Sequence, residues 1–323
     1  MSDALLVGID DVRAAAARLQ PYLRETPCEE SAWLSAIAGA PVFVKWESLQ
    51  PTGSFKVRGA LHKLLRLRER GVTRVLAVSA GNHGQGVAHA ARLLGMEATV
   101  VVPESAAPTK VQAIQRYGVE LLARGRDYDA AETEARALAE TRGVEFVSPY
   151  NDPDVIAGQG TAVLELCAVC PFETLVVPVG GGGLLAGAAI AARALRPDAA
   201  IVGAQPAGAP AMHAALAAGA IVPVDEEPTC ADGLSGNLEA GSITVPIAQA
   251  LVDRVALVAE ASIERAIRGF LAGDHMVVEG SGAVGAALVI EAGNSLFRPG
   301  PIALLATGRN IDLGRLEGIL QRT

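Results

Sequence analysis

The sequence predicts an α/β protein with mostly parallel sheets that are covered by helices on both faces. Short β-branched runs alternate along the chain with Ala- and Leu-rich segments whose apolar residues recur at helical spacing. Of the 323 residues, 50% are hydrophobic and 19% are charged, which is enough apolar material for two domains or one large one. No internal repeat or low-complexity linker interrupts the alternation.

In order along the chain, eight short β-branched runs predict strands. Runs of this kind are typical of parallel sheets that are buried on both faces. The expected strands are 41–46, 74–79, 97–103, 119–124, 175–179, 200–205, 254–258 and 302–307.

Helical stretches separate these strands. In the first of them, Ser54 is a good N-cap, and apolar residues from Val57 onward follow at helical spacing. An amphipathic helix is also expected within residues 1–19, and the two prolines of SPYNDPD indicate a boundary near residue 150. The expected helices are 54–70, 84–94, 108–117, 128–142, 155–169, 183–195, 208–219, 261–273 and 280–293.

Charge and hydropathy exclude two classes of partner. The net charge is −8, so there is no basic field to attract nucleic acid. The longest apolar run, Leu184–Ala192, is too short to cross a bilayer. We therefore expect neither a nucleic-acid partner nor a membrane partner.

The N-terminal residues and the cysteines predict a cytoplasmic protein without a metal site. Acids occupy the place where a signal peptide has its basic region. The four cysteines form no disulfide framework, and Cys167 and Cys170 lack the second pair that a metal site of this type needs. We expect them to be small buried side chains.

Lys56, in the stretch PTGSFKVRGA, is a candidate nucleophile. A turn and an N-cap precede it, so it falls in the first turn of a helix. The positive end of the helix dipole disfavours a cation there. One interpretation is a solvated lysine that costs little stability; the other is a lysine kept neutral so that it can attack a carbonyl group.

Four consecutive glycines, Gly180–Gly183, follow a strand and open a helix. Their bare N–H groups form a cradle for an anion and suit a phosphate best. A dinucleotide site competes, since Gly181, Gly183 and Ala186 fit G-x-G-x-x-A. The next strand, however, ends in Gln205 and not in the acid that ribose binding needs.

Two further strand-to-helix loops lie where active sites occur in such folds. Loop 79–86 (SAGNHGQG) opens a helix with Ser79, Asn82 and His83, and suits a small carboxylate. Loop 306–312 (ATGRNID) carries a hydroxyl on a glycine turn. Together the loops predict a ligand with a phosphate, a group that reacts with lysine, and a neighbouring carboxylate. Pyridoxal 5′-phosphate with an amino acid satisfies all three, with a lysine Schiff base as the covalent link.

Six motifs, in order along the chain, resemble those of the fold-type-II pyridoxal-phosphate enzymes, and most closely the serine/threonine dehydratase and serine racemase group. They are SFKVRGA, SAGNHGQGVA, VIAGQGT, VGGGGLLAG, TCADGLS and SGAVGAAL, within residues 10–315. The resemblance implies two three-layer α/β/α domains with mostly parallel twisted sheets, like those of tryptophan synthase β. A large cofactor-binding domain is expected at 1–50 plus 148–323, and a small substrate-side domain at 51–147. A homo-oligomer, either a dimer or a tetramer, is also implied.

The resemblance further implies roles for single residues. Lys56 would carry the cofactor and then act as the base at the substrate Cα. The other expected cofactor contacts are Phe55 beside the ring, Asn82 at the 3-hydroxyl, Thr307 at the pyridine nitrogen, and the amides of Gly180, Gly181, Gly182, Gly183 and Leu184 at the phosphate. The residues expected beside the substrate are Ser79, Ala80, Gly81 and His83.

Three departures from the family pattern refine this expectation. Ala80 stands where the racemase has a second serine on the opposite face of Cα, which favours elimination over inversion. Gln205 and Ala211 replace the acids of the racemase's divalent-metal site, so no metal is expected. Arg309 is unusual for the family at this position near Thr307. It therefore suggests, as an alternative, a substrate other than threonine.

The expected activity is that of an ammonia-lyase. It would convert a β-hydroxy amino acid, first of all L-threonine or L-serine, to 2-oxobutanoate or pyruvate plus ammonia. The alternatives, in order, are a dehydratase of another β-hydroxy amino acid (3-hydroxyaspartate, phenylserine or a catabolic intermediate), a serine racemase and an NAD(P)-binding oxidoreductase. A non-catalytic amino-acid sensor is not favoured while Lys56 is present.

Overall fold

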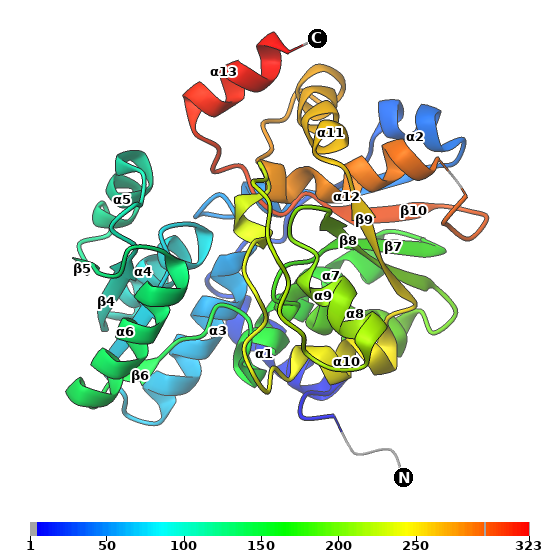
Figure 1. Cartoon of the computed structure of the whole chain (residues 1–323). Coiled ribbons are helices and arrows are strands. Elements are labelled where there is room, and N and C mark those ends of the chain that lie inside the picture. Colours follow the sequence, from blue (N-terminus) through cyan, green and yellow to red (C-terminus); the bar gives the residue numbers. More distant parts are fainter. Residues whose placement is uncertain (1–4, 294, 323) are drawn as a thin grey trace.

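The computed structural model describes residues 5–293 and 295–322, which form two sheets surrounded by helices (Figure 1). The larger sheet has six strands, in the spatial order β1 (Cys28–Glu30), β2 (Val42–Lys45), β10 (Ile302–Leu305), β7 (Thr174–Pro178), β8 (Ala200–Pro206) and β9 (Arg254–Val258). The smaller has four, in the order β5 (Glu120–Ala123), β4 (Glu97–Val102), β3 (Arg74–Val78) and β6 (Glu145–Phe146).

Neighbouring strands in the described residues run parallel, except for β1 and β2 at one edge of the larger sheet. The last strand of the chain, β10, lies between β2 and β7, and its Ile302 pairs with both Val42 and Thr174. Parallel neighbours need crossover connections, which the helices supply. The strand-to-helix loops of each sheet therefore collect at one edge.

The helices have the following bounds in the structure. They are α1 Ile9–Leu19, α2 Ala32–Ala38, α3 Lys56–Glu69, α4 Asn82–Leu94, α5 Pro108–Gln115, α6 Tyr128–Arg142, α7 Pro153–Val169, α8 Gly183–Leu195, α9 Ala211–Ala218, α10 Thr244–Leu251, α11 Glu260–Gly273, α12 Gly280–Ala292 and α13 Leu313–Gln321, with short 3-10 helices η1 Glu47–Leu49 and η2 Asp232–Leu234.

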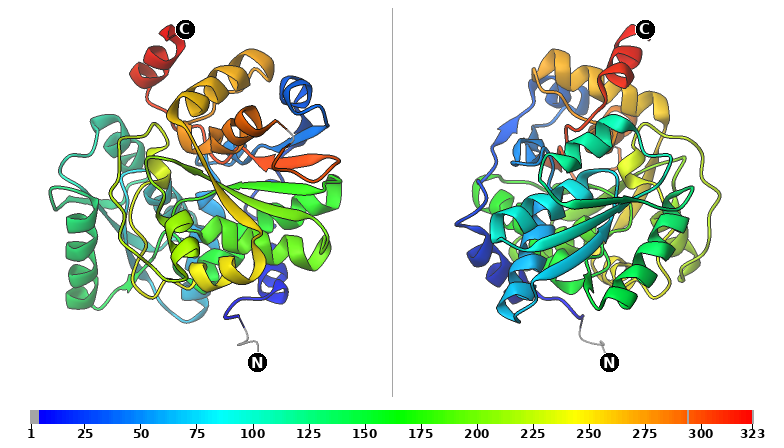
Figure 2. Two further views of the ribbon diagram at one scale, coloured as in Figure 1. Left: turned by 45° about the vertical axis from the view of Figure 1, so that its right-hand side comes forward. Right: turned by 90° about the vertical axis from the view of Figure 1, so that its left-hand side faces the viewer.

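Helices cover both faces of each sheet (Figure 2). On the larger sheet, Leu175 and Val177 face α1, α7, α8 and α10, whereas Val176 faces α2, α11 and α12. On the smaller sheet, α3 and α4 pack on one face and α6 on the other. The predicted α/β class is confirmed. The smaller sheet comes wholly from residues 74–146, and the two domain boundaries stay a prediction.

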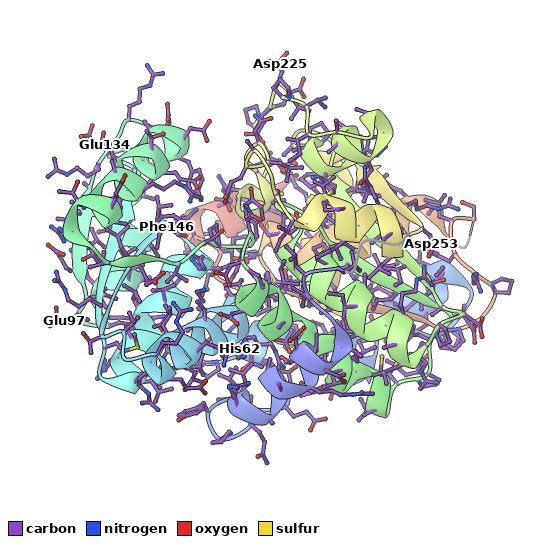
Figure 3. The ribbon with its side chains drawn as sticks, turned by 90° about the horizontal axis from the view of Figure 1, so that it is seen from below. His62, Glu97, Glu134, Phe146, Asp225 and Asp253 are labelled. Atoms are coloured by element: carbon purple, nitrogen blue, oxygen red, sulfur yellow. The ribbon has the colours of Figure 1, made fainter. Side chains whose placement is uncertain are left out.

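Glycines allow α3, α7 and α8 to pack closely. A Cβ on Gly187 of α8 would lie 2.6 Å from the backbone nitrogen of Gly160 on α7. Likewise, a Cβ on Gly158 of α7 would lie 2.7 Å from the Cα of Gly59 on α3. His62 of α3 is at this contact, with Nδ1 2.7 Å from a backbone carbonyl oxygen of α7 (Figure 3). This packing holds α3, which begins at the candidate nucleophile, against the larger sheet's helices.

Each predicted strand and helix is present within a few residues of its expected bounds. The elements not predicted, β1, β6, α2, α10 and α13, are short, so their sequences contain too little periodicity to identify them. The helix expected in residues 1–19 occupies Ile9–Leu19, and residues 1–4 lie outside the described residues.

The predicted N-cap of α3 is wrong. Phe55 occupies the N-cap position, no side chain caps the helix, and Ser54 instead forms an isolated antiparallel bridge with Gly308. Tertiary pairing with the loop after β10 therefore overrides the capping preference of serine. Among the described residues, no helix combines the length and the apolarity that a bilayer span requires.

Candidate active site

A cavity of about 450 Å³ lies at the carboxyl ends of the strands, where loops of both sheets meet. Its walls include the loops after β3, β7 and β10 and the start of α3. Binding sites of α/β folds lie at this edge, and small-molecule sites have volumes of this order. It is therefore the candidate active site.

Every residue that the sequence predicted for the site lines this cavity, although the residues come from four separate segments of the chain. They are Phe55, Lys56, Ser79, Ala80, Gly81, Asn82, His83, Gly180, Gly181, Gly182, Gly183, Leu184 and Thr307. Their individual roles toward cofactor and substrate stay predictions.

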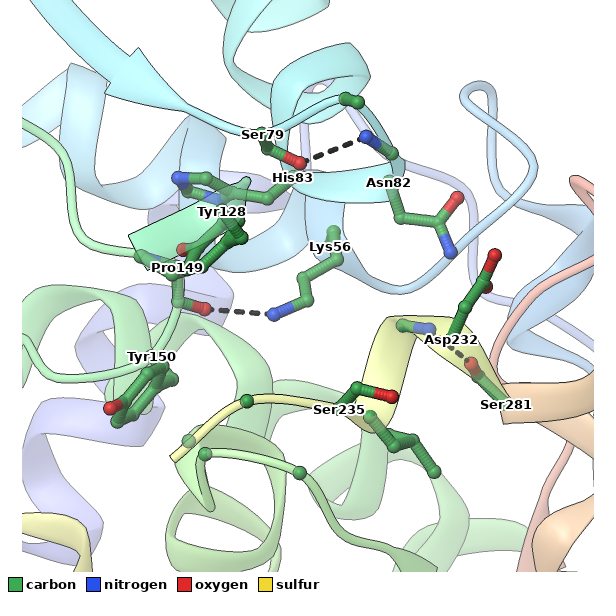
Figure 4. Close-up of a pocket in the computed structure, with 18 of the residues that line it drawn as sticks. Lys56, Ser79, Asn82, His83, Tyr128, Pro149, Tyr150, Asp232, Ser235 and Ser281 are labelled. Carbon is green, nitrogen blue, oxygen red and sulfur yellow. Dashed lines mark hydrogen bonds between the residues drawn. The ribbon is translucent and has the colours of Figure 1, made fainter. Parts of the chain in front are cut away.

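Lys56 is the first residue of α3, and its side chain extends into the cavity (Figure 4). Its Nζ donates to the carbonyl oxygen of Pro149 at 2.9 Å and lies 5.3 Å from the centroid of the Phe55 ring. Burial lowers the pKa of Lys56 to about 8. A much larger fraction of the amine is therefore neutral near pH 8 than in an exposed lysine, as a nucleophile or base requires.

The loop after β10 holds the turn that precedes Lys56. The backbone N–H of Phe55 donates to the carbonyl oxygen of Thr307 at 3.0 Å, and that of Arg309 donates to Gly53 at 2.9 Å. The Thr307 hydroxyl, which lines the cavity, donates to a backbone carbonyl of α12 at 3.3 Å. Arg309 itself is exposed and is not among the residues that line the cavity.

The start of α4 presents bare backbone to the cavity. No side chain caps this helix, and the Gly81 N–H donates to the Ser79 hydroxyl at 3.0 Å. The ring of His83 is buried, with Nε2 donating to the carbonyl oxygen of Val147 at 2.9 Å. Burial, assisted by the nearby Lys56 charge, lowers the pKa of His83 to about 3. His83 is therefore neutral at working pH and cannot attract a carboxylate through charge.

The glycine loop between β7 and α8 has no room for side chains, because neighbouring residues pack directly against its backbone. Gly182 has a φ of +88°, and a Cβ there would lie 2.5 Å from the Cε of Met212. A Cβ on Gly181 would lie 2.4 Å from the ring of Tyr150, which packs against the loop. No side chain caps α8, so its first N–H groups and its dipole are available to an anion.

A network that the sequence did not predict surrounds Asn82. Its Nδ2 donates to Glu279 Oε1 at 2.5 Å, and its Oδ1 accepts from Asn310 Nδ2 at 2.6 Å. Burial raises the pKa of Glu279 to about 7. In the sequence, the only sign of Glu279 was an acid directly before the small residues that begin α12. Its position beside α4 depends on the tertiary structure.

A segment without long elements, residues 232–239, forms a strap along the cavity. Residues 232–237 of it line the wall (Figure 4). Both its ends bind helices of the smaller sheet: Asp232 lies 2.7 Å from Lys110 Nζ of α5, and Glu239 lies 2.9 Å from Arg136 of α6. Tyr150 also holds the strap in place, because its hydroxyl oxygen accepts a hydrogen bond from the Glu239 N–H at 2.8 Å. The motif TCADGLS overlaps the start of the strap, but the motif alone did not indicate this structural role.

Comparisons with known proteins agree with this geometry. Residues 19–308 match the model of the pyridoxal-phosphate dependent enzyme family. An L-threonine ammonia-lyase of Thermotoga maritima is 38% identical over 98% of this chain and 79% of its own length. An L-threo-3-hydroxyaspartate ammonia-lyase of Pseudomonas sp is 39% identical over 96% of this chain and 98% of its own.

Two solved structures resemble the whole fold. Maize serine racemase superimposes with a TM-score of 0.90 at 34% identity, covering 97% of both chains. A threonine deaminase of T.th. has a TM-score of 0.88 at 41% identity, covering 95% of this chain and 99% of its own. The sequence match and the shared fold lead to one conclusion: this chain belongs to the pyridoxal-phosphate-dependent enzyme family.

Proposed function

We propose that the protein is an ammonia-lyase that converts a β-hydroxy amino acid, L-threonine or L-serine, to the corresponding 2-oxo acid and ammonia. The observation that carries the proposal is the position of Lys56, whose pKa is lowered to about 8, in one cavity with two uncapped helix N-termini. The names of the relatives support the reaction class, since both curated relatives described above are ammonia-lyases.

The cavity fits pyridoxal phosphate. The loop Gly180–Gly183 carries no side chains and opens α8 without a side-chain cap, so its N–H groups would hold the phosphate. Lys56 would attach the cofactor, with Asn82 and Thr307 beside the ring. When bound, the cofactor supplies a conjugated electron sink that makes the Cα proton of an attached amino acid acidic.

The chain's own residues then have separable tasks. The Lys56 amine accepts and holds the Cα proton, because burial leaves about half of it neutral near pH 8. The first N–H groups of α4, which begins at Asn82 and has no side-chain cap, bind the substrate carboxylate. Ala80 presents a methyl group instead of a second proton-bearing side chain, which favours elimination over inversion at Cα.

The test is a 2-oxo-acid assay on the purified holoenzyme with L-threonine, L-serine and phenylserine. Fast 2-oxobutanoate release from threonine is the expected result. Lys56→Ala should abolish the visible absorbance of the lysine-bound cofactor and reduce turnover by orders of magnitude. Unchanged turnover in that variant, or bound cofactor with no turnover of any of the three substrates, would refute the proposal.

We also propose that the chain forms a homo-oligomer, a dimer or tetramer, in the cytoplasm. Helix α13 lies at the periphery of the molecule (Figure 2), where Arg268 of α11 donates to the carbonyl oxygen of its Ile319 at 2.9 Å. Its Leu313 and Leu320 are 67% and 42% exposed. Exposed apolar side chains on a peripheral helix suit a surface that a second copy covers. Light scattering on the purified protein measures the mass, and a monomer at micromolar concentration would contradict the assembly.

A further inference from the structure

The start of α10 contacts the glycine loop from outside the cavity. Thr244, the first residue of α10, donates from Oγ1 to the carbonyl oxygen of Gly181 at 2.8 Å. It also lies against the next residue, because a Cβ on Gly182 would be 2.9 Å from Thr244 Oγ1. Thr244 is fully buried and is not among the residues that line the cavity. Its hydroxyl therefore holds the loop from the side that a ligand does not reach.

A second buried hydroxyl orients the first. Ser242 Oγ lies 2.8 Å from Thr244 Oγ1, and both side chains are buried. A carbonyl oxygen can only accept, so the single hydrogen of the Thr244 hydroxyl goes to Gly181. The Ser242 hydroxyl must then be the donor to Thr244. A hydroxyl that accepts one hydrogen bond donates a stronger one, so Ser242 strengthens the bond from Thr244 to the loop.

The segment that carries the two hydroxyls is held by the protein itself. The Ile243 N–H donates to Asn151 Oδ1 at 3.0 Å, and Asn151 Nδ2 donates to Glu239 of the strap at 3.0 Å. The Ser242 N–H donates to the carbonyl oxygen of Glu239 at 3.1 Å. Packing of this chain alone therefore places both hydroxyls beside Gly181.

Holding the Gly181 carbonyl also orients the Gly182 N–H, because the two groups belong to one peptide. In a trans peptide the C=O and N–H bonds point in opposite directions, and the described residues contain no cis peptide. The carbonyl points to Thr244, so the N–H points away from it, toward the cavity that Gly182 lines. Within the described part of the chain, the Gly182 N–H donates no hydrogen bond. It is a preset donor for an anion.

We propose that Thr244 is a positioning residue for the cofactor phosphate, holding the Gly181–Gly182 peptide so that its N–H faces that group. The inference rests on the phosphate position given with the proposed function, and it adds a residue that lies outside the cavity. Two adjacent glycines have no side chains to restrict the peptide between them. Without the Thr244 hydroxyl, this peptide has to be ordered when the phosphate binds, which lowers the affinity.

The test compares two ligands that differ only in the phosphate. The full-length chain, freed of cofactor by dialysis against hydroxylamine, is titrated with pyridoxal 5′-phosphate and with pyridoxal, which has the same aldehyde. Thr244→Val keeps the side-chain shape and removes the hydroxyl. Its Kd for pyridoxal 5′-phosphate should rise about tenfold, and its Kd for pyridoxal should change less than about twofold. Equal weakening of both ligands, or no weakening of either, would overturn the inference.

Two variants of threonine provide the controls. Thr244→Ser restores the hydroxyl and should bind both ligands as the native protein does. Thr161→Val is the matched control, because the Thr161 hydroxyl is also buried, accepts from Arg58 at 3.1 Å and donates to the carbonyl oxygen of Gly158 at 2.7 Å. It should lower the melting temperature and keep the native preference for pyridoxal 5′-phosphate over pyridoxal. A loss of preference in either control as large as that in Thr244→Val would overturn the inference.

Phosphorus NMR of the holoenzyme reports on the phosphate directly. The resonance should move in Thr244→Val and stay in place in Thr161→Val; a resonance that does not move in Thr244→Val would overturn the inference. Ser242→Ala keeps the Thr244 hydroxyl but removes the donor that orients it, so its Kd for pyridoxal 5′-phosphate should rise about threefold. An unchanged Kd would refute the role of Ser242.

Gly182→Ala separates the two ways in which the inference can fail. If this variant keeps the native preference for pyridoxal 5′-phosphate, the phosphate does not bind at the glycine loop, and the inference fails with that position. If it loses the preference while Thr244→Val keeps it, the phosphate position stands and the role of Thr244 is refuted. None of these measurements requires turnover, so the 2-oxo-acid assay tests the ammonia-lyase proposal independently.

Discussion

Replacing Arg58 with alanine should lower the melting temperature of the protein by about 4–7 °C. Arg58 lies on α3, two residues after Lys56, and is 1% exposed. Its guanidinium forms one fork with Glu47, through Nε at 2.7 Å and Nη2 at 2.8 Å. A second fork binds Glu165 of α7, with both N–O distances at 2.7 Å. Lys45 Nζ donates to the same Glu165 at 2.7 Å, so two cations and two anions form a buried network.

The magnitude follows from the burial of Glu47, whose side chain is 0% exposed. Removing one partner of a buried ion pair leaves the other charge uncompensated and costs about 3–5 kcal/mol. An unfolding entropy of about 2.1 cal/mol/K per residue, over 323 residues, amounts to about 0.7 kcal/mol/K. Dividing the first value by the second gives the expected shift of about 4–7 °C.

The pH dependence is a second signature. Burial would raise the pKa of Glu47, but the charges of Arg58 and Lys45 and the bonds from Arg58 and Thr26 hold it below its ordinary value. Glu47 therefore stabilises the native protein above its unfolded pKa of about 4.3, and this contribution is lost as the pH falls through the lower folded pKa. Without Arg58, burial dominates and Glu47 protonates more readily. The loss of stability in Arg58→Ala should thus be largest near pH 8 and shrink toward pH 5.

Thermal unfolding of the holoenzyme at pH 5 and pH 8 measures both effects. Arg13→Ala is the control, because its partner Asp10 lies on the surface and the two side chains are 55% and 91% exposed; that change should stay near zero. Arg58→Lys keeps the positive charge but loses the paired hydrogen bonds to Glu47 and Glu165. Its decrease in melting temperature should lie between those of Arg58→Ala and Arg13→Ala. A shift in Arg58→Ala as small as that of Arg13→Ala would refute the reasoning.

Three further predictions concern the cavity. Gly182→Ala should lower both the melting temperature and the cofactor affinity more than Gly219→Ala does. Both glycines have a positive φ, but only at Gly182 would a Cβ lie against neighbouring atoms. Equal losses in the two variants would mean that the positive φ alone matters. The folded pKa of Glu279, about 7, lies above its unfolded value of about 4.3, so this group destabilises the native state as the pH rises. The melting temperature of Glu279→Gln, measured relative to that of the native protein, should therefore rise between pH 5 and pH 8. Melting temperatures of the two proteins that change in parallel with pH would contradict this. Ala80→Ser should raise D-serine formation from L-serine relative to pyruvate, as chiral chromatography measures, and no rise would mean that this face does not control the outcome.

Much of the site could be predicted because its chemistry lies in local sequence. A glycine run after a strand creates bare N–H groups wherever the fold places it, so Gly180–Gly183 was identifiable as an anion cradle from the residues alone. A cation in the first turn of a helix runs against the dipole, which made Lys56 a candidate, and the neighbouring loops then favoured the nucleophile over a solvated lysine. Ligand identity was less certain, because Gly181, Gly183 and Ala186 also fit a dinucleotide pattern. The lack of an acid at Gln205, the end of the next strand, favoured the phosphate.

Other features depend on partners that are distant in the chain. Ser54 is a residue type that favours N-caps, yet it forms a bridge with Gly308 and Phe55 takes the N-cap position. Glu279 is an ordinary acid in the sequence, and its pKa of about 7 arises from burial beside Asn82, almost 200 residues away. The commitment of Lys110 to Asp232 is equally invisible without the fold.

The division has a physical reason. Backbone geometry, helix starts and the alternation of strands and helices are set by neighbouring residues, and they specify the α/β class and the position of Lys56 at the start of a helix. Desolvation, ion pairing and the net charge of a cavity are sums over segments brought together by packing. The pKa values of Lys56, His83 and Glu279 arise only once that packing has removed water from around them.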